Sequence, residues 1–181
     1  MIDYLKIIQK YYRTDTEQYR LLLTHSRQVA EYAMTLLEQR PQIIVDREFV
    51  YEAAMLHDIG IFQTDAKGIC CTGKEPYLMH GLIGAELLRR EGLERHALVC
   101  ERHIGSGLTA EEIREQHLPL PARDFLPVTL EEKLVCYADN FFSKSKIDAP
   151  RRTVAKLLKS VAKYGPGTLQ RFEQMHTLFG E

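Results

Sequence analysis

Residues 54–60 read AMLHDIG, and in this stretch His57 and Asp58 interrupt an otherwise apolar run. We predict that the stretch belongs to a helix over 47–61, because apolar residues recur along it at helical spacing. The buried face of that helix is marked by Val50, Ala53, Ala54 and Ile61. His57 falls on the same face, with Asp58 one residue further round. A carboxylate at such a position needs a partner, since burial of an unpaired charge is costly.

Similar residues lie far away along the chain. His25 has apolar neighbours at spacings of three and four on a predicted helix over 16–39, so it faces the core. His103 ends a predicted helix over 93–103, and Asp139 ends the apolar run LVCYAD. A single buried histidine is usually a core residue with a hydrogen-bond partner. Several imidazoles and carboxylates that converge from different helices are what a divalent transition metal prefers, and one metal site accounts for all these burials together.

Helical periodicity also runs through the rest of the chain, without a convincing alternating strand pattern, so we predict an all-α fold. Helix starts are indicated by capping-box patterns at 14–17, 109–112 and 129–132 and by Asp46 as an N-cap, and Gly92 has the position of a left-handed C-cap. The predicted helices are 2–12, 16–39, 47–61, 79–91, 93–103, 110–116, 130–143, 151–163 and 167–178. The irregular parts are 62–77, 104–107 and the Pro-rich 118–127.

The chain has the size of one domain, with 181 residues and neither an internal repeat nor a long linker. A chain of this length buries roughly 70% of its unfolded surface on folding. We therefore expect a single compact domain over 1–181, with a motif core over 20–145. The N-terminal helix 2–12 and the C-terminal helices 151–178 are additions to that core. The N-terminal helix could serve a homodimer, and it could equally cover the bundle.

The charge composition excludes some partners. Lys and Arg number 24 against 25 Asp and Glu, which gives a formal net charge of −1 and argues against duplex nucleic acid as the main partner. No stretch approaches the ~20 apolar residues that cross a bilayer, and the N-terminus lacks the features of a secretory signal. The four cysteines lack zinc-finger spacing and are expected to be reduced, packed thiols in a cytoplasmic protein.

The order of these residues, with His25 first, the pair His57 and Asp58 next and Asp139 last, resembles the HD-domain superfamily of metal-dependent phosphohydrolases. The HDIG string lies in a helical segment and in the correct order with the two outer residues, which makes the signal strong. The strings ERHIG at 101–105, TLEEK at 129–133 and YADN at 137–140 are similar to a small group of uncharacterised bacterial and archaeal HDIG proteins. The resemblance implies an HD-type helical bundle.

The resemblance also implies a ligand set. One metal would be held by His25, His57, Asp58 and Asp139. A second would be held by His80 and His103, with the Asp58 carboxylate bridging the two ions. The cofactors would be one or two divalent transition metals, with Fe, Mn, Ni, Zn or Mg as candidates. Asp58 would also be catalytic, because it would orient the attacking water. His96 is expected at the rim or surface, and no role is assigned to His117 or His176.

For the substrate, the resemblance implies a small phosphorylated molecule such as a nucleotide. Candidate phosphate-binding residues are Arg102, Arg123 and Lys144. Gln28 stands where HD enzymes that cleave symmetrical dinucleoside polyphosphates commonly carry a basic residue, and Ile61 stands where the HD-GYP cyclic-dinucleotide group carries Lys. Both departures argue against those two substrates. The loop 62–77 could form a lid over the site or an ordinary surface loop.

Two other functions remain open at this point. The inositol oxygenase-like group of HD proteins uses the same six-ligand set for a di-iron centre that activates oxygen, and ligands alone do not separate the two chemistries. A nucleotide sensor without turnover is the non-enzymatic alternative. The intact ligand set argues against the sensor.

Overall fold

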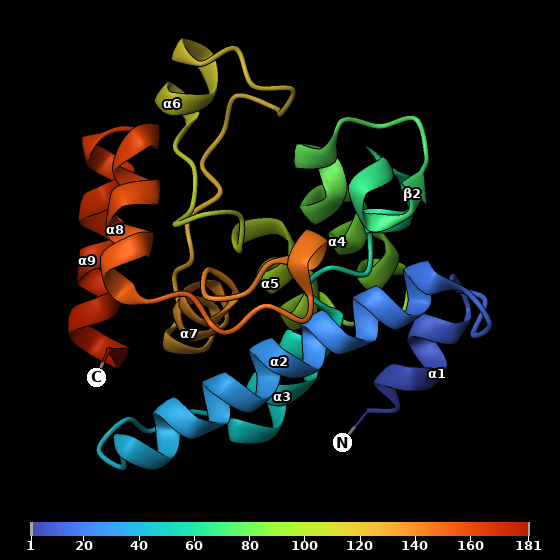
Figure 1. Cartoon of the computed structure of the whole chain (residues 1–181), viewed down its shortest axis with the longest axis horizontal. Helices are drawn as coiled ribbons and strands as arrows, with labels where there is room; N and C mark the ends of the chain where they lie inside the picture. The colour runs from blue at the N-terminus through green and yellow to red at the C-terminus, as the bar shows by residue number, and fades with distance from the viewer. Residues whose placement is uncertain (1, 181) are drawn as a thin grey trace.

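Two consecutive helices and a third one far along the chain pack together in the computed structural model, which describes residues 2–180 (Figure 1). The long α2 (Glu17–Gln39) packs against α3 (Arg47–Leu56), and both contact α7 (Leu130–Asp139). Around them lie α1 (Tyr4–Gln9), α4 (His80–Arg90), α5 (Glu94–Arg102), α6 (Ala110–Glu115), α8 (Val154–Val161) and α9 (Pro166–Phe179). The all-α prediction is confirmed, and the described residues form one compact domain. Met1 and Glu181, the ends of the predicted 1–181 domain, lie outside the described residues.

The predicted loop 62–77 contains short ordered elements. A two-stranded antiparallel sheet pairs β1 (Asp65–Ala66) with β2 (Cys71–Thr72), and it lies among three 3-10 turns. These turns are η1 (Ile61–Gln63), η2 (Lys67–Ile69) and η3 (Tyr77–Met79), while η4 (Lys144–Lys146) and η5 (Ala162–Tyr164) lie further along the chain.

Helix starts follow the predicted chemistry with two differences. Asp46 caps α3 through the Phe49 amide, and Thr109 forms the complete capping box of α6. The predicted box at 14–17 is wrong, because Thr16 is the N-cap of α2 and accepts from the Tyr19 amide. At 129–132 the Thr129 hydroxyl caps α7, but the Glu132 carboxylate accepts from the Val128 amide instead of closing the box.

Among the helices that end earlier than predicted, two end at metal-ligand candidates. The helix predicted over 47–61 ends at Leu56, because the Ile59 amide donates to the Leu56 carbonyl and the chain enters a tighter turn. The helix predicted over 130–143 ends at Asp139. Since neighbouring residues on an α-helix point in different directions, the early end of α3 allows His57 and Asp58 to face the same point.

The core consists of two apolar clusters that meet at these residues. On α2, Leu22 belongs to one cluster and Val29 to the other, and His25 lies between them in the chain. At the end of α3, Met55 and Leu56 likewise belong to different clusters. The polar centre is therefore placed at the junction of two apolar regions, where water has little access.

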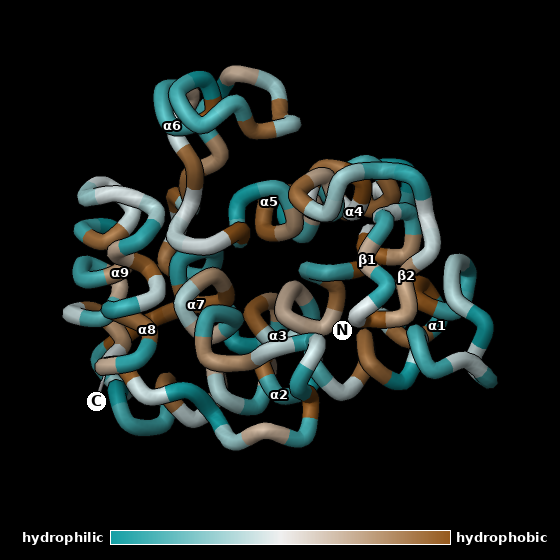
Figure 2. The backbone as a smooth tube through the Cα atoms, turned by 45° about the horizontal axis from the view of Figure 1, so that its top comes forward, coloured by the Kyte–Doolittle hydropathy of each residue, from teal (hydrophilic) through white to brown (hydrophobic). Residues whose placement is uncertain are grey.

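The N-terminal helix covers the bundle: Ile8 is fully buried in the core, and the Tyr12 hydroxyl donates to the Ile59 carbonyl. Figure 2 shows α6 as a largely hydrophilic segment at the edge of the fold. All four cysteines are free thiols, and only Cys70 is exposed. None of the described helices is long and apolar enough to cross a membrane.

Candidate metal centre

Six side chains from five helices and one turn meet between the two apolar clusters. His25 comes from the middle of α2, His57 from the C-cap of α3, and Asp58 from the turn that follows. His80 is the first residue of α4, His103 the C-cap of α5, and Asp139 the last residue of α7. Five of these residues are at most 3% exposed, and the Asp139 side chain is 15% exposed. The centre is thus largely buried, and Asp139 is its most exposed member.

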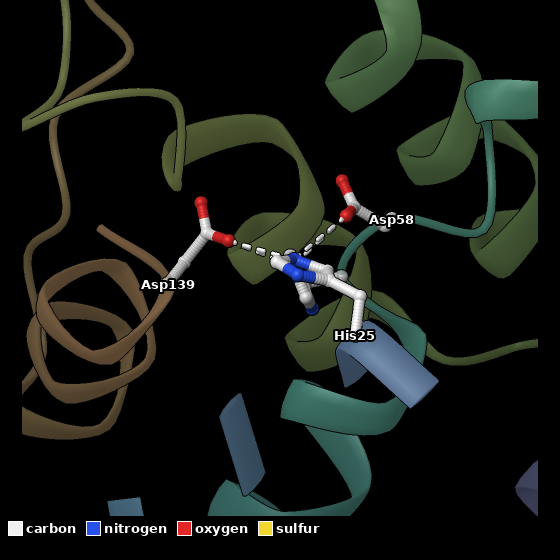
Figure 3. A group of neighbouring side chains, drawn as sticks. His25, Asp58 and Asp139 are labelled. Carbon is white, nitrogen blue, oxygen red and sulfur yellow. Dashed lines mark hydrogen bonds and ion pairs between the residues drawn. The ribbon is translucent and has the colours of Figure 1, made fainter. Parts of the chain in front are cut away.

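The six residues form two groups that share Asp58. In the first group, Asp58 Oδ2 lies 3.3 Å from His25 Nε2 and 3.2 Å from His57 Nε2. Asp139 Oδ1 completes this group at 2.9 Å from His25 Nε2 (Figure 3). In the second group, Asp58 Oδ1 lies 3.4 Å from the Nε2 atoms of both His80 and His103. One carboxylate therefore presents one oxygen to each group, as a carboxylate that bridges two cations does.

Backbone carbonyls orient three of the four imidazoles. The Nδ1 atoms of His57, His80 and His103 lie 2.6, 2.6 and 2.7 Å from the carbonyl oxygens of Ala54, Tyr77 and Cys100, each three residues earlier. These contacts place a proton on Nδ1 of each ring, so Nε2 is the atom that faces the centre. A second hydrogen bond of this kind is typical of metal-ligating histidines.

The polar atoms of the centre are incompletely satisfied by the protein. His57 Nε2 and both carboxylate oxygens of Asp58 are buried without a hydrogen bond of acceptable geometry. The Nε2 atoms of His80 and His103 are 3.1 Å apart, and two lone pairs at that distance repel unless a proton or cation lies between them. Buried polar atoms normally have partners. The donor set therefore fits divalent transition metals, which take imidazole and carboxylate ligands.

The electrostatics of the centre favour positive charge. Burial lowers the pKa of His57, but the carboxylates of Asp58 and Asp139 outweigh burial and raise it to about 10. Burial dominates at His80 and lowers its pKa to about 3, so this ring is neutral. Burial raises the pKa of Asp58 and of Asp139, but His57, Lys144 and His25 outweigh burial and bring both pKa values well below the usual value. Both carboxylates are charged and attract cations.

Of the three predicted phosphate-binding residues, only Lys144 reaches the centre. Its Nζ lies 2.7 Å from Asp58 Oδ2 and 3.7 Å from Asp139 Oδ1. The guanidinium of Arg102 is paired with Glu132 at 3.0 Å, and that of Arg123 with Glu101 at 2.6 Å. Both arginines neutralise carboxylates that are themselves almost buried, so they are structural ion pairs in this structure.

The prediction that His96 lies at the rim or surface is wrong. The residue is 7% exposed, and its Nε2 lies 3.3 Å from a carboxylate oxygen of the similarly buried Glu52.

Sequence reasoning also missed Tyr77, whose ring stacks on His80 with the centroids 4.6 Å apart. The only sequence signal for Tyr77 is its position three residues before a candidate ligand, the same spacing at which a carbonyl orients each of the three histidines.

The HD domain family matches residues 22–143, a stretch that contains all six residues of the centre. The chain belongs to the HD domain family. This family implies the superfamily of metal-dependent phosphohydrolases, in agreement with the resemblance read from the sequence.

Relatives add context for the family. An uncharacterised protein of Methanocaldococcus jannaschii is 38% identical over 148 residues, which cover 80% of each chain. The tRNA (cytidine(56)-2′-O)-methyltransferases of Picrophilus torridus and Thermoplasma volcanium are 36% and 34% identical over 70% and 78% of this chain. The match covers only 33% and 36% of those two proteins, so it extends over about a third of their length. No solved structure shows a significant match to the chain.

Proposed function

We propose that this HD protein is a metal-dependent phosphohydrolase that hydrolyses a nucleotide or another small phosphate ester. The observation that supports the proposal is the shared carboxylate: each oxygen of Asp58 faces its own group of imidazole nitrogens. In this proposal His25, His57, Asp58 and Asp139 hold one divalent cation, and His80 and His103 hold a second together with Asp58. Bound there, a cation pair would neutralise the phosphate ester and lower the pKa of a water to about 7.

The protein residues have separate tasks in this reaction. Asp58 accepts a hydrogen bond from the attacking water and orients it toward phosphorus. The carbonyls behind His57, His80 and His103 keep the imidazole rings in one tautomer and one orientation. Burial of these groups excludes bulk water, which strengthens every electrostatic contact within the centre.

Lys144 is the proposed phosphate-binding cation. Its ammonium group lies at the edge of the centre where Asp139 is partly exposed, and it contacts both carboxylates. With divalent cations on those carboxylates, the ammonium group is free to donate to a phosphate oxygen. Arg102 and Arg123 have no place in this proposal, since each is paired with a glutamate away from the centre.

The test is a metal analysis of the purified protein together with a screen of phosphorylated metabolites in the presence of Mn²⁺. Nucleotides derived from RNA belong in this screen, because about a third of each of two relatives named as tRNA methyltransferases is similar to this chain. Release of phosphate or cleavage of a diester that depends on Asp58 supports the proposal. Iron-specific oxygen consumption would support an oxygenase, and tight nucleotide binding without turnover would support a sensor.

A further inference from the structure

A strongly basic segment follows the last ligand candidate. Between Ser143 and Lys159 the chain carries six Lys or Arg residues against the single acidic residue Asp148, although the whole chain has a net charge of −1. In Figure 1 this segment is the orange chain that runs from η4 to α8. The basic residues are Lys144, Lys146, Arg151, Arg152, Lys156 and Lys159.

Two adjoining cavities run along this segment. The first has a volume of about 320 Å³ and is lined by Lys144 and Tyr77, which both contact residues of the metal centre. The second has a volume of about 440 Å³ and is lined by Lys146 and Lys156. Both cavities share Phe142, Ser143, Ser145 and Arg152 in their walls. The two cavities thus adjoin each other between Lys144, which contacts the metal centre, and Lys156 on α8.

The segment is held in place by the core. Phe141 and Ile147 are 2% and 7% exposed and anchor it in the two apolar clusters. The Arg152 amide donates to the Phe141 carbonyl at 2.9 Å, and the Gln28 side chain donates to the Ile147 carbonyl at 3.0 Å. Backbone groups fixed in this way keep the lining side chains near one position, which lowers the entropy lost on ligand binding.

Three of the basic residues that line these cavities have no carboxylate partner among the described residues. Among residues 2–180, no carboxylate lies within ion-pair distance of Lys146, Arg152 or Lys156. Arginines elsewhere behave differently: Arg89 is paired with Glu101 at 2.8 Å, and Arg171 with Glu112 at 2.7 Å. Unpaired cations together with two serine hydroxyls in a concave surface provide the donors that phosphate oxygens require.

We propose that this basic groove, formed by Ser143, Ser145, Lys146, Arg152 and Lys156, binds a second phosphate group of the substrate. The substrate class is then a small molecule with at least two phosphate groups, one held at the metal centre beside Lys144 and one in the groove. This inference rests on the proposed function, since it takes the metal centre as the place of the first phosphate.

The experiment compares adenosine 5′-monophosphate with adenosine 3′,5′-bisphosphate as ligands of the Mn²⁺-loaded protein. Calorimetry gives both dissociation constants, and unreacted ligand is verified after each titration. We expect the bisphosphate to bind about tenfold tighter or more, which corresponds to about 1.4 kcal/mol. Arg152→Gln and Lys156→Gln should each reduce this ratio toward one. Lys159→Gln, three residues along the same helix and outside both cavities, is the matched control and should keep the ratio.

Hydrolysis of p-nitrophenyl phosphate by the same preparation tests the proposed function separately. A protein that hydrolyses this ester but binds the two nucleotides equally would refute the groove and leave the proposed function intact. A protein that hydrolyses neither this ester nor any compound of the metabolite screen, but still prefers the bisphosphate through Arg152, would refute the proposed function and support the groove. If Lys159→Gln lowered the affinity ratio as much as Lys156→Gln, the preference would come from the overall positive charge of the segment, and the groove would be refuted. Binding of 5′-phosphorylated RNA that tightens with strand length would overturn the small-molecule assignment.

Discussion

Gly60 is the residue whose replacement tests most directly how the fold positions the metal centre. A Cβ atom at this position would lie 2.2 Å from the His80 carbonyl oxygen and 2.4 Å from the Gly84 amide nitrogen. The backbone of Gly60 has a negative φ of −84°, so glycine is required here by the close approach of α4 and not by an unusual conformation. Both obstructing atoms belong to backbone, which has no rotamer to move.

The size of the effect follows from these distances. An ordinary contact begins at 3.4 Å, so α4 has to retreat from the turn by about 1 Å in Gly60→Ala. Overpacking of this kind costs up to about 3 kcal/mol. The reduced entropy of the unfolded chain returns about 0.4–1 kcal/mol. We therefore expect the free energy of unfolding to fall by roughly 2 kcal/mol, and the urea midpoint by about 1 M for a slope of about 2 kcal/mol/M.

The same displacement should weaken the second ligand group. His80 begins α4, and metal ligands have to lie within about 0.2 Å of their normal distances. Gly60→Ala is thus expected to lose one equivalent of metal in addition to stability. Gly68→Ala is the control, since a Cβ there meets nothing within 4 Å. An unchanged urea midpoint and full metal content in Gly60→Ala would refute the close-packing argument.

Other predictions concern charge. Asp58→Ala should abolish metal retention and hydrolysis while the helical circular dichroism persists, because Asp58 belongs to both ligand groups; retained activity would contradict its role. His103→Ala should lower the metal content from two ions to one. Mn²⁺ uptake near pH 7 should release a proton and tighten with rising pH, since the pKa of His57 is about 10 without metal; titration in two buffers of different ionisation enthalpy measures that release. Burial raises the pKa of Glu112, but the ion pair with Arg171 outweighs burial and lowers this pKa below its usual value of 4.5. The pair therefore stabilises the fold at pH values above 4.5. Glu112→Gln should therefore lower stability by about 1 kcal/mol at neutral pH, and the difference from wild type should vanish as the pH falls below 4.5, as denaturation at a series of pH values can measure.

The sequence was sufficient for the helices and for the identity of the residues that meet at the centre. The helices and the inward position of His25 and His57 follow from local rules, because apolar residues at helical spacing define the buried faces. His80 and the division into two ligand groups came only from the resemblance to HD proteins. The resemblance to HD proteins then supplied the order that connects distant segments.

The ends of the helices could not be predicted in the same way. After α3 ends at Leu56, the following turn packs against α4 through Gly60, a contact with residues twenty or more positions further along the chain. Periodicity reports which face is buried, and it contains no information on what that face touches. The same reason explains His96, whose burial depends on Glu52 of a different helix.

Charged residues were the least predictable. Nothing in the sequence distinguishes Arg102, Arg123 and Lys144 as phosphate-binding candidates. In the structure, only Lys144 lies beside the two aspartates. Partner choice decides the difference, because a glutamate from another segment neutralises each arginine. The basic run after Asp139 was visible in the sequence as a local charge excess, yet only the cavities along it indicate a use for that excess.

The centre makes the fold less stable by itself than an apolar junction would be. Burial of two carboxylates and an ammonium group loses several kcal/mol of hydration per ion, and well-packed apolar side chains of similar volume often do as well or better than such a cluster. A ligand that binds only the folded state restores stability, by about 2.7 kcal/mol at one hundred times its dissociation constant. The two apolar clusters on either side of His25 and His57 are therefore what allows the chain to keep an electrostatically costly site at its centre, and a cation bound there would join both halves of the bundle through Asp58.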